Sequence, residues 1–232
     1  MSDPSPTRGP CPPPELAIVI PTFNEAGNVA EIARRIGASL KGIAWEIIFV
    51  DDDSADGTAE RVRELARADS RIRLLRRVGR RGLSSACIEG MLATTAPFLA
   101  VIDADLQHDE TLLPRMLACL QAEDLDIVVG SRYVSGGNVG DWDGRRQAMS
   151  RFASRLAQRL IHAGLADPMS GFFMLRAPAL AACVGDLSGV GYKILLDIFA
   201  SSPRPLKFAE LPYGFRQREH GESKLDNAVL WE

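Results

Sequence analysis

The sequence predicts an α/β fold, with a doubly wound and mostly parallel β-sheet flanked by helices. Three observations support this prediction. Short apolar runs of strand length alternate with segments of helical period. Acidic and amide residues directly follow several of the apolar runs. The chain has 232 residues, of which 46% are hydrophobic and 25% charged, so it has the composition and length of a globular domain with its own core.

The predicted elements alternate from the first strand onward. A β-branched run at 16–20 ends at Pro21, and a helix is expected over 25–40 with Asn24 as its N-cap. Further strands are expected at 45–50, 71–75, 97–102 and 126–130, and further helices at 58–68, 82–94 and 111–121. Strands that alternate with helices in this way usually lie parallel.

The second half of the chain is less regular. The pattern predicts, in order, a glycine-rich loop at 135–143, an amphipathic helix at 145–162, a turn and strand at 167–176, short helices as far as Ala200, and a strand at 206–211. We therefore expect a proline-rich, disordered N-terminus at 1–15 and one domain at 16–211. Residues 212–232 would form a basic loop and the start of a C-terminal helix.

Composition excludes several classes of protein. The net charge of −3 argues against a nucleic-acid-binding protein. No apolar run approaches the length of about 18 residues that a membrane span needs. The four cysteines are scattered and form no CxxC pair, which favours reduced thiols in a cytoplasmic setting. No Gly-x-Ser-x-Gly, Walker-type or Gly-x-Gly-x-x-Gly motif is present, and His108 and His162 have no evident catalytic partner.

The most informative segment is 98–107, an apolar run that ends in Asp103 and Asp105, with Gln107 two residues further on. If the extended conformation continued past the strand, these three side chains would point the same way. Carboxylate and amide oxygens suit Mg²⁺ or Mn²⁺, ions that usually complete their coordination with phosphate oxygens. The segment therefore predicts a metal site for a phosphate-bearing substrate; a solvated turn after a strand is the alternative.

Two other strand ends carry polar residues. Residues 21–25 follow the first strand and 50–54 follow the second, both at the edge where open α/β sheets bind ligands. Together they favour a nucleotide pocket in which Asp accepts hydrogen bonds from a base or ribose and Phe23 covers the base. Helix capping by Asn24 and a turn over 54–57 are the structural alternative.

Basic residues supply candidate phosphate contacts. Arg132 directly follows a predicted strand, and Arg146 and Ser150 share one face of the predicted helix. Arg218 and Lys224 bracket a glycine-containing segment able to close over a diphosphate. A solvated helix face and a flexible tail are the alternatives for these two groups.

A set of motifs occurs in order along the chain: PTFNE (21–25), VDDDSADGT (50–58), DADLQH (103–108), GSRYV (130–134), DPMSGFF (167–173) and GESKL (221–225). With these motifs the chain resembles family 2 glycosyltransferases of the GT-A fold, and among them the polyprenyl-phosphate (dolichol-phosphate) mannose synthases. The resemblance covers about residues 16–225.

The resemblance implies an inverting, metal-dependent enzyme that transfers mannose from GDP-mannose to a polyprenyl or dolichyl phosphate, peripherally at the cytoplasmic face of a membrane. It implies that Mg²⁺ or Mn²⁺ is held by Asp103, Asp105 and Gln107. It also implies that the catalytic residues are Asp105, Arg132, Arg146 and Ser150. It assigns the donor nucleotide to Pro21, Phe23, Glu25, Val50, Asp51, Asp52 and Ala104, the acceptor phosphate to Arg132, Arg146 and Ser150, and the diphosphate to Arg218 and Lys224. Phe23 stands where the family often has Tyr.

Two other functions stay open at this point. One is transfer of glucose from UDP-glucose to a polyprenyl phosphate by the same fold. The other is a non-catalytic module that binds nucleotide sugars.

Overall fold

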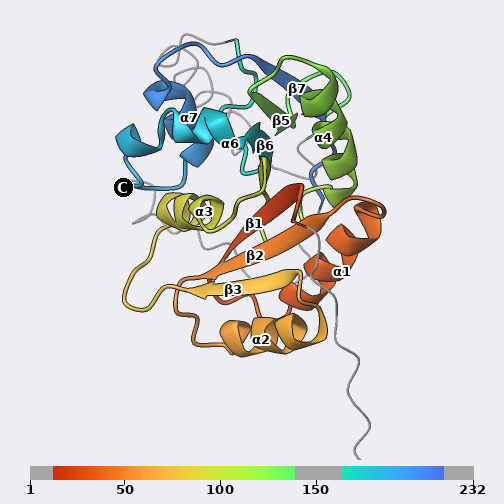
Figure 1. The fold of residues 1–232 in the computed structure, drawn as a ribbon, viewed down its shortest axis with the longest axis vertical. Coiled ribbons are helices and arrows are strands. Elements are labelled where there is room, and N and C mark those ends of the chain that lie inside the picture. The colour runs from red at the N-terminus through yellow and green to blue at the C-terminus, as the bar shows by residue number, and fades with distance from the viewer. Residues whose placement is uncertain (1–12, 139–163, 217–232) are drawn as a thin grey trace, which may run out of the picture.

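The computed structural model describes residues 13–138 and 164–216 (Figure 1). Their strands form a seven-stranded sheet in the order β3-β2-β1-β4-β6-β5-β7. The strands are β1 (Leu16–Thr22), β2 (Trp45–Asp51), β3 (Ile72–Arg76), β4 (Phe98–Val101), β5 (Ile127–Ser131), β6 (Phe173–Arg176) and β7 (Phe208–Pro212). Every neighbouring pair is parallel except the two that β6 makes, with β4 and with β5. The mostly parallel sheet predicted from the sequence is confirmed.

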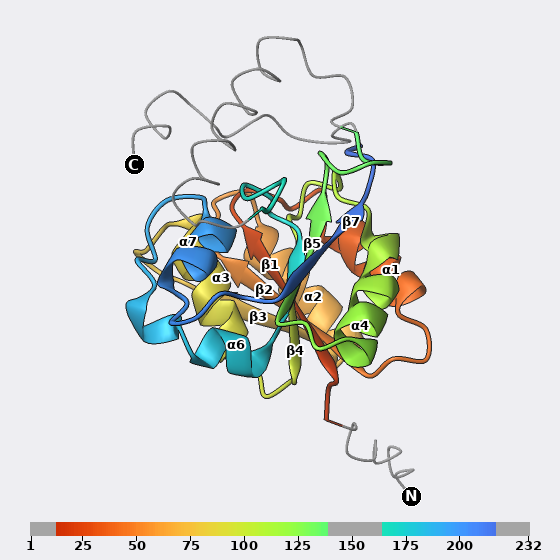
Figure 2. The ribbon, with the colours of Figure 1, turned by 90° about the horizontal axis from the view of Figure 1, so that it is seen from above.

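Helices cover both faces of this sheet (Figure 2). They are α1 (Val29–Ser39), α2 (Thr58–Ala68), α3 (Leu83–Leu92), α4 (Leu113–Ala122), α6 (Ala177–Ala181) and α7 (Ile194–Ser201), with short 3₁₀ turns η1 (Glu110–Leu112) and η2 (Val184–Asp186). Apolar residues of α1, α2 and α4 belong to one core cluster, and those of α3, α6 and α7 to the other. The molecule is therefore a three-layer α/β/α structure.

The strand residues divide between these two clusters by alternation. In β2, Ile47 and Phe49 join the α1 side, whereas Ile48 and Val50 join the α3 side. All seven residues of β2 are buried. A strand buried on both faces reads as a continuous apolar run, which is why this strand was visible in the sequence.

Two local expectations were wrong. The first strand does not stop at Pro21 but runs to Thr22, with Pro21 paired opposite Val50 of β2. Pairing with β4 on the other side ends at Val19, so a residue without an N–H is tolerated there. Helix α1 begins at Val29 rather than 25, and Asn24 does not cap it.

Several predicted segments lie outside the described residues. These are the N-terminus as far as residue 12, the amphipathic helix at 145–162 and the chain from 217 onward. Within the described part of the chain, no helix has both the length and the apolar character that crossing a bilayer requires. The cysteines in that part, Cys87, Cys119 and Cys183, are free thiols.

Candidate functional site

The ends of β1, β2 and β4 bring three of the predicted motifs to one edge of the sheet. The three strands are parallel neighbours, with Thr22 opposite Asp51 and Val19 opposite Val101. The loops that follow them therefore leave the sheet side by side. This is the edge at which open α/β sheets bind ligands.

Asp51, at the end of β2, is fully buried and is held by the protein's own donors. Its Oδ1 accepts hydrogen bonds from the hydroxyls of Thr22 (3.3 Å) and Ser54 (2.5 Å), and its Oδ2 accepts from the Ser54 amide at 3.1 Å. The carboxylate expected to contact a nucleoside thus fastens the β2 loop to the end of β1.

Asn24 continues this connection between the two loops. It adopts a left-handed conformation (φ 55°), its amide donates to the Ser54 hydroxyl at 2.8 Å, and its Oδ1 accepts from the Ala55 amide at 3.1 Å. Next to it, the Glu25 amide donates to the Thr58 hydroxyl, and the Glu25 carboxylate accepts from the Asn28 side chain at 2.6 Å. The motifs at 21–25 and 50–58 therefore form one hydrogen-bonded unit.

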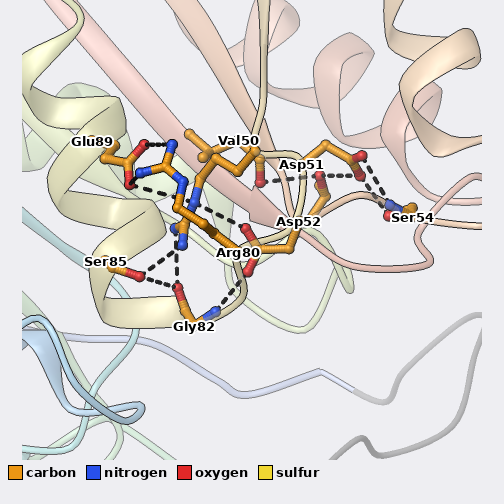
Figure 3. A network of polar contacts seen from close by, with 10 residues as sticks. Val50, Asp51, Asp52, Ser54, Arg80, Gly82, Ser85 and Glu89 are labelled. Atoms are coloured by element: carbon orange, nitrogen blue, oxygen red, sulfur yellow. Dashed lines mark hydrogen bonds and ion pairs between the residues drawn. The ribbon is translucent and has the colours of Figure 1, made fainter.

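Asp52 faces the turn that precedes α3 (Figure 3). Its Oδ2 accepts a hydrogen bond of 2.8 Å from the Gly82 amide, and its Oδ1 lies 3.4 Å from Nε of the buried Arg77. Burial raises the pKa of Asp52, and the Gly82 amide and Arg77 act against that rise.

The remaining predicted nucleotide residues lie around these loops. The Phe23 ring is partly exposed, and the guanidinium of Arg81 lies over it at 4.4 Å from the ring centroid. Val50 and Ala104 are buried, and Pro21 is half-buried in β1. Aromatic rings and arginine guanidinium planes are both groups on which nucleobases stack.

The acidic segment after β4 is a turn rather than a continued strand. β4 ends at Val101, and Leu106 has a left-handed conformation with φ 64°. The Gln107 amide donates to Asp105 Oδ1 at 3.2 Å, and the Gln107 side chain donates to the Arg216 carbonyl at 3.0 Å. The premise that extended alternation aligns Asp103, Asp105 and Gln107 was wrong, because the chain turns between them.

These residues nevertheless fit a hard divalent cation. The Asp103 carboxylate lies in a cradle against Gly171, where a Cβ added to the glycine would come within 2.9 Å of its Oδ2. No group of three or more His, Cys, Asp or Glu side chains in the described part of the chain is arranged to hold a metal. Cations such as Mg²⁺, where one or two carboxylates hold them, take further oxygens from substrate phosphates and water.

His108 supports this turn from within the core. It is buried, stacks on Phe172 with ring centroids 5.4 Å apart, and its Nδ1 accepts a hydrogen bond of 3.3 Å from the Asp103 amide. Burial lowers the pKa of His108 to about 3, so the ring is neutral. From the sequence, His108 had no evident catalytic partner, and this role in the turn was not predicted.

The guanidinium of Arg132, the predicted acceptor-phosphate contact, faces Asp167. Nε and Nη2 donate to the two carboxylate oxygens, each at 2.8 Å. Burial opposes the charge, yet the hydrogen bonds and the charge of Asp167 raise the pKa of Arg132 above its ordinary value. Glu210 of β7 in turn accepts the amides of Ala166 and Asp167. Sequence reasoning missed Asp167 and Glu210 as partners, and the only signal was Asp167 within the DPMSGFF motif.

The segment after β7 packs onto the acidic turn. Arg216 donates to Glu110 at 2.6 Å and to Asp109 at 2.7 Å, and its amide donates to the Gln107 carbonyl. The other predicted phosphate contacts, Arg146, Ser150, Arg218 and Lys224, lie outside the described residues. The described site therefore comprises the loops after β1, β2 and β4, the turn before α3 and the segment after β7.

Comparison with known proteins agrees with this architecture. Residues 17–183 match the family model described as Glycosyl transferase family 2. The chain is 37% identical over 221 residues to a dolichol-phosphate mannosyltransferase of Pyrococcus furiosus, covering 94% of this chain and 61% of that protein. It is 35% identical over 225 residues to the protein of the same name from Saccharomyces cerevisiae, covering 93% of this chain and 83% of that protein.

Solved structures show the same fold. Glucosyl-3-phosphoglycerate synthase from Mycobacterium tuberculosis, in complex with Mn²⁺, UDP and glucosyl-3-phosphoglycerate, has a TM-score of 0.66 at 20% identity, covering 90% of this chain and 73% of that one. The GT-A fold implied by the sequence motifs is confirmed. The chain therefore belongs to glycosyl transferase family 2, within the group of its members related to dolichol-phosphate mannosyltransferases.

Proposed function

We propose that this protein transfers mannose from GDP-mannose to the phosphate of a polyprenol or dolichol, with Mg²⁺ or Mn²⁺ and with inversion at the anomeric carbon. The chain spans 61% of the length of the archaeal relative, so its activity is inferred from the site together with the names of its relatives. Because the proposed acceptor is a lipid, the proposed place of action is a membrane surface, and the family resemblance implies its cytoplasmic face.

The observation that carries this proposal is the position of Asp103 and Asp105. They follow β4 at the same sheet edge as the two hydrogen-bonded loops after β1 and β2. A nucleoside bound by those loops would have its diphosphate directed to the neighbouring acidic turn. Bound by Asp103, Asp105 and Gln107, Mg²⁺ or Mn²⁺ would supply Lewis-acid neutralisation of the charge on the departing diphosphate.

The proposed transfer needs no strong general base. A phosphate monoester has a second pKa of about 6, so the acceptor is already an anion at neutral pH. One of its oxygens would bond to the anomeric carbon while the bond from that carbon to the donor diphosphate breaks, and GDP would leave with the electron pair. His108 is buried and neutral, and its Nδ1 already accepts the Asp103 amide, so it serves the structure of the turn rather than proton transfer.

The task of the protein is then alignment of the two substrates. Asp167 holds Arg132 through both of the hydrogen bonds described above. We infer that this pair positions the chain around the acceptor phosphate, and Arg132 remains a predicted contact of that phosphate. Arg146 and Ser150 remain predicted acceptor contacts, and Arg218 and Lys224 remain predicted contacts of the diphosphate.

A radiolabelled transfer assay tests the proposal. Purified protein is supplied with GDP-mannose or UDP-glucose, a short polyprenyl phosphate, and either Mn²⁺ or EDTA. We expect labelled lipid from GDP-mannose with Mn²⁺ only. Lipid labelled from UDP-glucose alone would overturn the donor assignment, and no labelled lipid from either donor would overturn the transfer itself.

The matched variants are Asp105→Asn and Asp124→Asn. Asp105→Asn should lower the rate by about 100-fold or more, because metal stabilisation of the leaving group contributes several kcal/mol. Asp124 lies before β5 at the opposite edge of the sheet, and its side chain is 92% exposed. Its substitution should leave the transfer rate unchanged.

A further inference from the structure

Arg77 is an almost completely buried arginine directly after β3, with 1% of its surface exposed. Arginine is rarely buried in this way unless it is paired. Its amide donates to the Asp51 carbonyl at 2.8 Å, which joins the end of β3 to the end of β2. Nothing in the sequence pattern marks Arg77 among the many arginines between 61 and 81.

The guanidinium of Arg77 holds the turn that leads into α3. Nη1 donates to the Gly82 carbonyl at 3.2 Å, and Nη2 donates to the Ser85 hydroxyl at 2.8 Å. On the other side of the same residue, the Gly82 amide donates to Asp52 (Figure 3). Gly82 has φ 140°, a conformation that L side chains rarely adopt. Arg77 and Asp52 thus fix both backbone polar groups of one glycine.

This turn also carries residues toward the nucleoside motif. Arg80 donates to both carboxylate oxygens of Glu89 in α3, at 2.8 and 3.0 Å. Arg81, the next residue, lies over the Phe23 ring. The position of the Arg81–Phe23 wall therefore depends on how the Gly82 turn is held.

The ionised form of the Asp52 carboxylate depends on the positive charge of Arg77. Nε of Arg77 is 3.4 Å from Asp52 Oδ1 and 3.5 Å from Glu89 Oε1, and Asp52 Oδ1 has no hydrogen-bond donor among the described residues. The groups that act on Asp52 are the Gly82 amide and Arg77, which favour its ionised form, and Asp51 and Glu89, which disfavour it. Removal of Arg77 would leave a buried carboxylate beside two other acids without its cation.

We propose that Arg77 is a positioning residue of the donor nucleotide site, which sets the Gly82 turn and Asp52 and through them the Phe23–Arg81 wall. The inference rests on the proposed function in one respect, that the nucleotide binds at the loops after β1 and β2. Among the described residues, the side-chain partners of Arg77 are Gly82, Ser85, Asp52 and Glu89, none of which belongs to the acidic turn after β4 or to the Arg132–Asp167 pair. Loss of Arg77 should therefore weaken nucleotide binding while the rate at saturating donor changes little.

Titration of GDP and UDP by calorimetry in the presence of Mn²⁺, between pH 5 and 8, tests this inference. The variants are Arg77→Met, Arg77→Lys and Arg77→Met combined with Asp52→Asn. Arg73→Met is the control, because Arg73 lies in β3, the strand that Arg77 follows, and pairs with a carboxylate of β2, Glu46, away from the turn. Thermal unfolding reports whether each variant is folded.

We expect Arg77→Met to raise the Kd of the bound nucleotide about 10-fold or more, in line with the loss of a buried charge-assisted contact. Its binding should also become sensitive to acid at a higher pH than in the wild type, because Asp52 then protonates more readily. Arg77→Lys keeps the positive charge but lacks the planar guanidinium. Its Kd for the nucleotide should therefore lie between those of the wild type and Arg77→Met. Compared with Arg77→Met, the variant that combines Arg77→Met with Asp52→Asn should be more stable to heat and should lose the added pH dependence of binding. It should still bind the nucleotide weakly.

Folded Arg77→Met with wild-type affinity and pH profile would overturn the inference, as would an equal effect from Arg73→Met. If Arg77→Met does not fold, Arg77→Lys and the double variant decide the question by the same two readouts. Wild-type protein that binds UDP and not GDP would overturn the proposed donor, while the effect of Arg77 would still be read on UDP. The two failures are therefore distinguishable.

Discussion

Arg132 and Asp167 face each other in two parallel hydrogen bonds of 2.8 Å, and the Arg132 amide adds a third to the same carboxylate at 3.2 Å. The Asp167 side chain is fully buried, and that of Arg132 is 9% exposed. This pair connects the end of β5 to the segment that precedes β6. In the sheet, β5 and β6 lie beyond β4 as seen from β2, so the pair lies on the side of the site away from the β2 loop.

Loss of the Asp167 carboxylate should strongly destabilise the protein. Asp167→Ala leaves the Arg132 cation buried without a partner, which costs about 3–5 kcal/mol. Chemical denaturation measures this as a fall in the free energy of unfolding. Asp124→Ala is the control, since its exposed pair with Lys207 is screened by solvent and should contribute little to the free energy of unfolding. Equal falls in the free energy of unfolding for Asp167→Ala and Asp124→Ala would show that the buried pair contributes no more to stability than the exposed pair.

A glycine at position 171 should be required for the position of the Asp103 carboxylate in the acidic turn, and not only for the stability of the fold. In Gly171→Ala the new methyl group would lie 2.9 Å from Asp103 Oδ2 and 3.3 Å from Oδ1, so the carboxylate must move. We expect Mn²⁺-dependent transfer to fall by about 10-fold or more, because displacing a reacting group by about 1 Å costs up to about 100-fold. A transfer assay over a range of Mn²⁺ concentrations measures the effect.

Gly164→Ala is the matched control for Gly171→Ala. A Cβ at Gly164 meets no atom within 4 Å, and this glycine lies before the Asp167 turn on the surface. It should keep wild-type activity at every Mn²⁺ concentration. Activity of Gly171→Ala that matches Gly164→Ala would show that the cradle around Asp103 has no part in transfer.

Asp126 should give the fold part of its acid sensitivity. Hydrogen bonds from Arg204 lower the pKa of Asp126, although partial burial opposes this, and the Lys207 amide adds to the lowering. A lowered pKa means that its contribution is present above the unfolded-state pKa of about 3.9 and is lost as the pH falls through the folded-state pKa.

Denaturation of Asp126→Asn against wild type tests this over pH 2–7. We expect Asp126→Asn to lower the free energy of unfolding by about 1–2 kcal/mol near neutral pH. The loss should be at the low end of this range, because Arg204 is exposed. The difference in unfolding free energy between variant and wild type should disappear in acid. A gap that stays constant down to pH 2 would contradict the assignment, because the loss would then come from packing.

The strands and their order along the chain could be predicted because apolar runs such as β2 are buried on both faces. The position of β6 in the sheet could not be predicted. It lies antiparallel between β4 and β5, although it follows β5 in the sequence. Insertion of a later strand into a sheet depends on long-range pairing, and no local pattern in residues 173–176 encodes it.

The types of side chain at the site could be predicted, but not their partners. Asn24 looked like a helix cap and instead joins two loops through Ser54, and Asp51, a predicted nucleoside contact, bonds to the same Ser54. The turn at Leu106 broke the alternation on which the metal prediction was built. Arg77, which has no motif of its own, emerged only from burial and contacts. Sequence periodicity describes which face a side chain occupies, whereas these roles depend on loops that approach each other in space.

A cation at the end of β4 is tested most directly by Mn²⁺ binding in the presence of GDP, followed by electron paramagnetic resonance, in wild type and in Asp105→Asn. We expect one Mn²⁺ bound per wild-type chain with GDP, and an affinity lower by about 10-fold or more in the variant, as happens when a carboxylate ligand is lost. Equal Mn²⁺ affinity in the two proteins would contradict a cation held by this acidic turn.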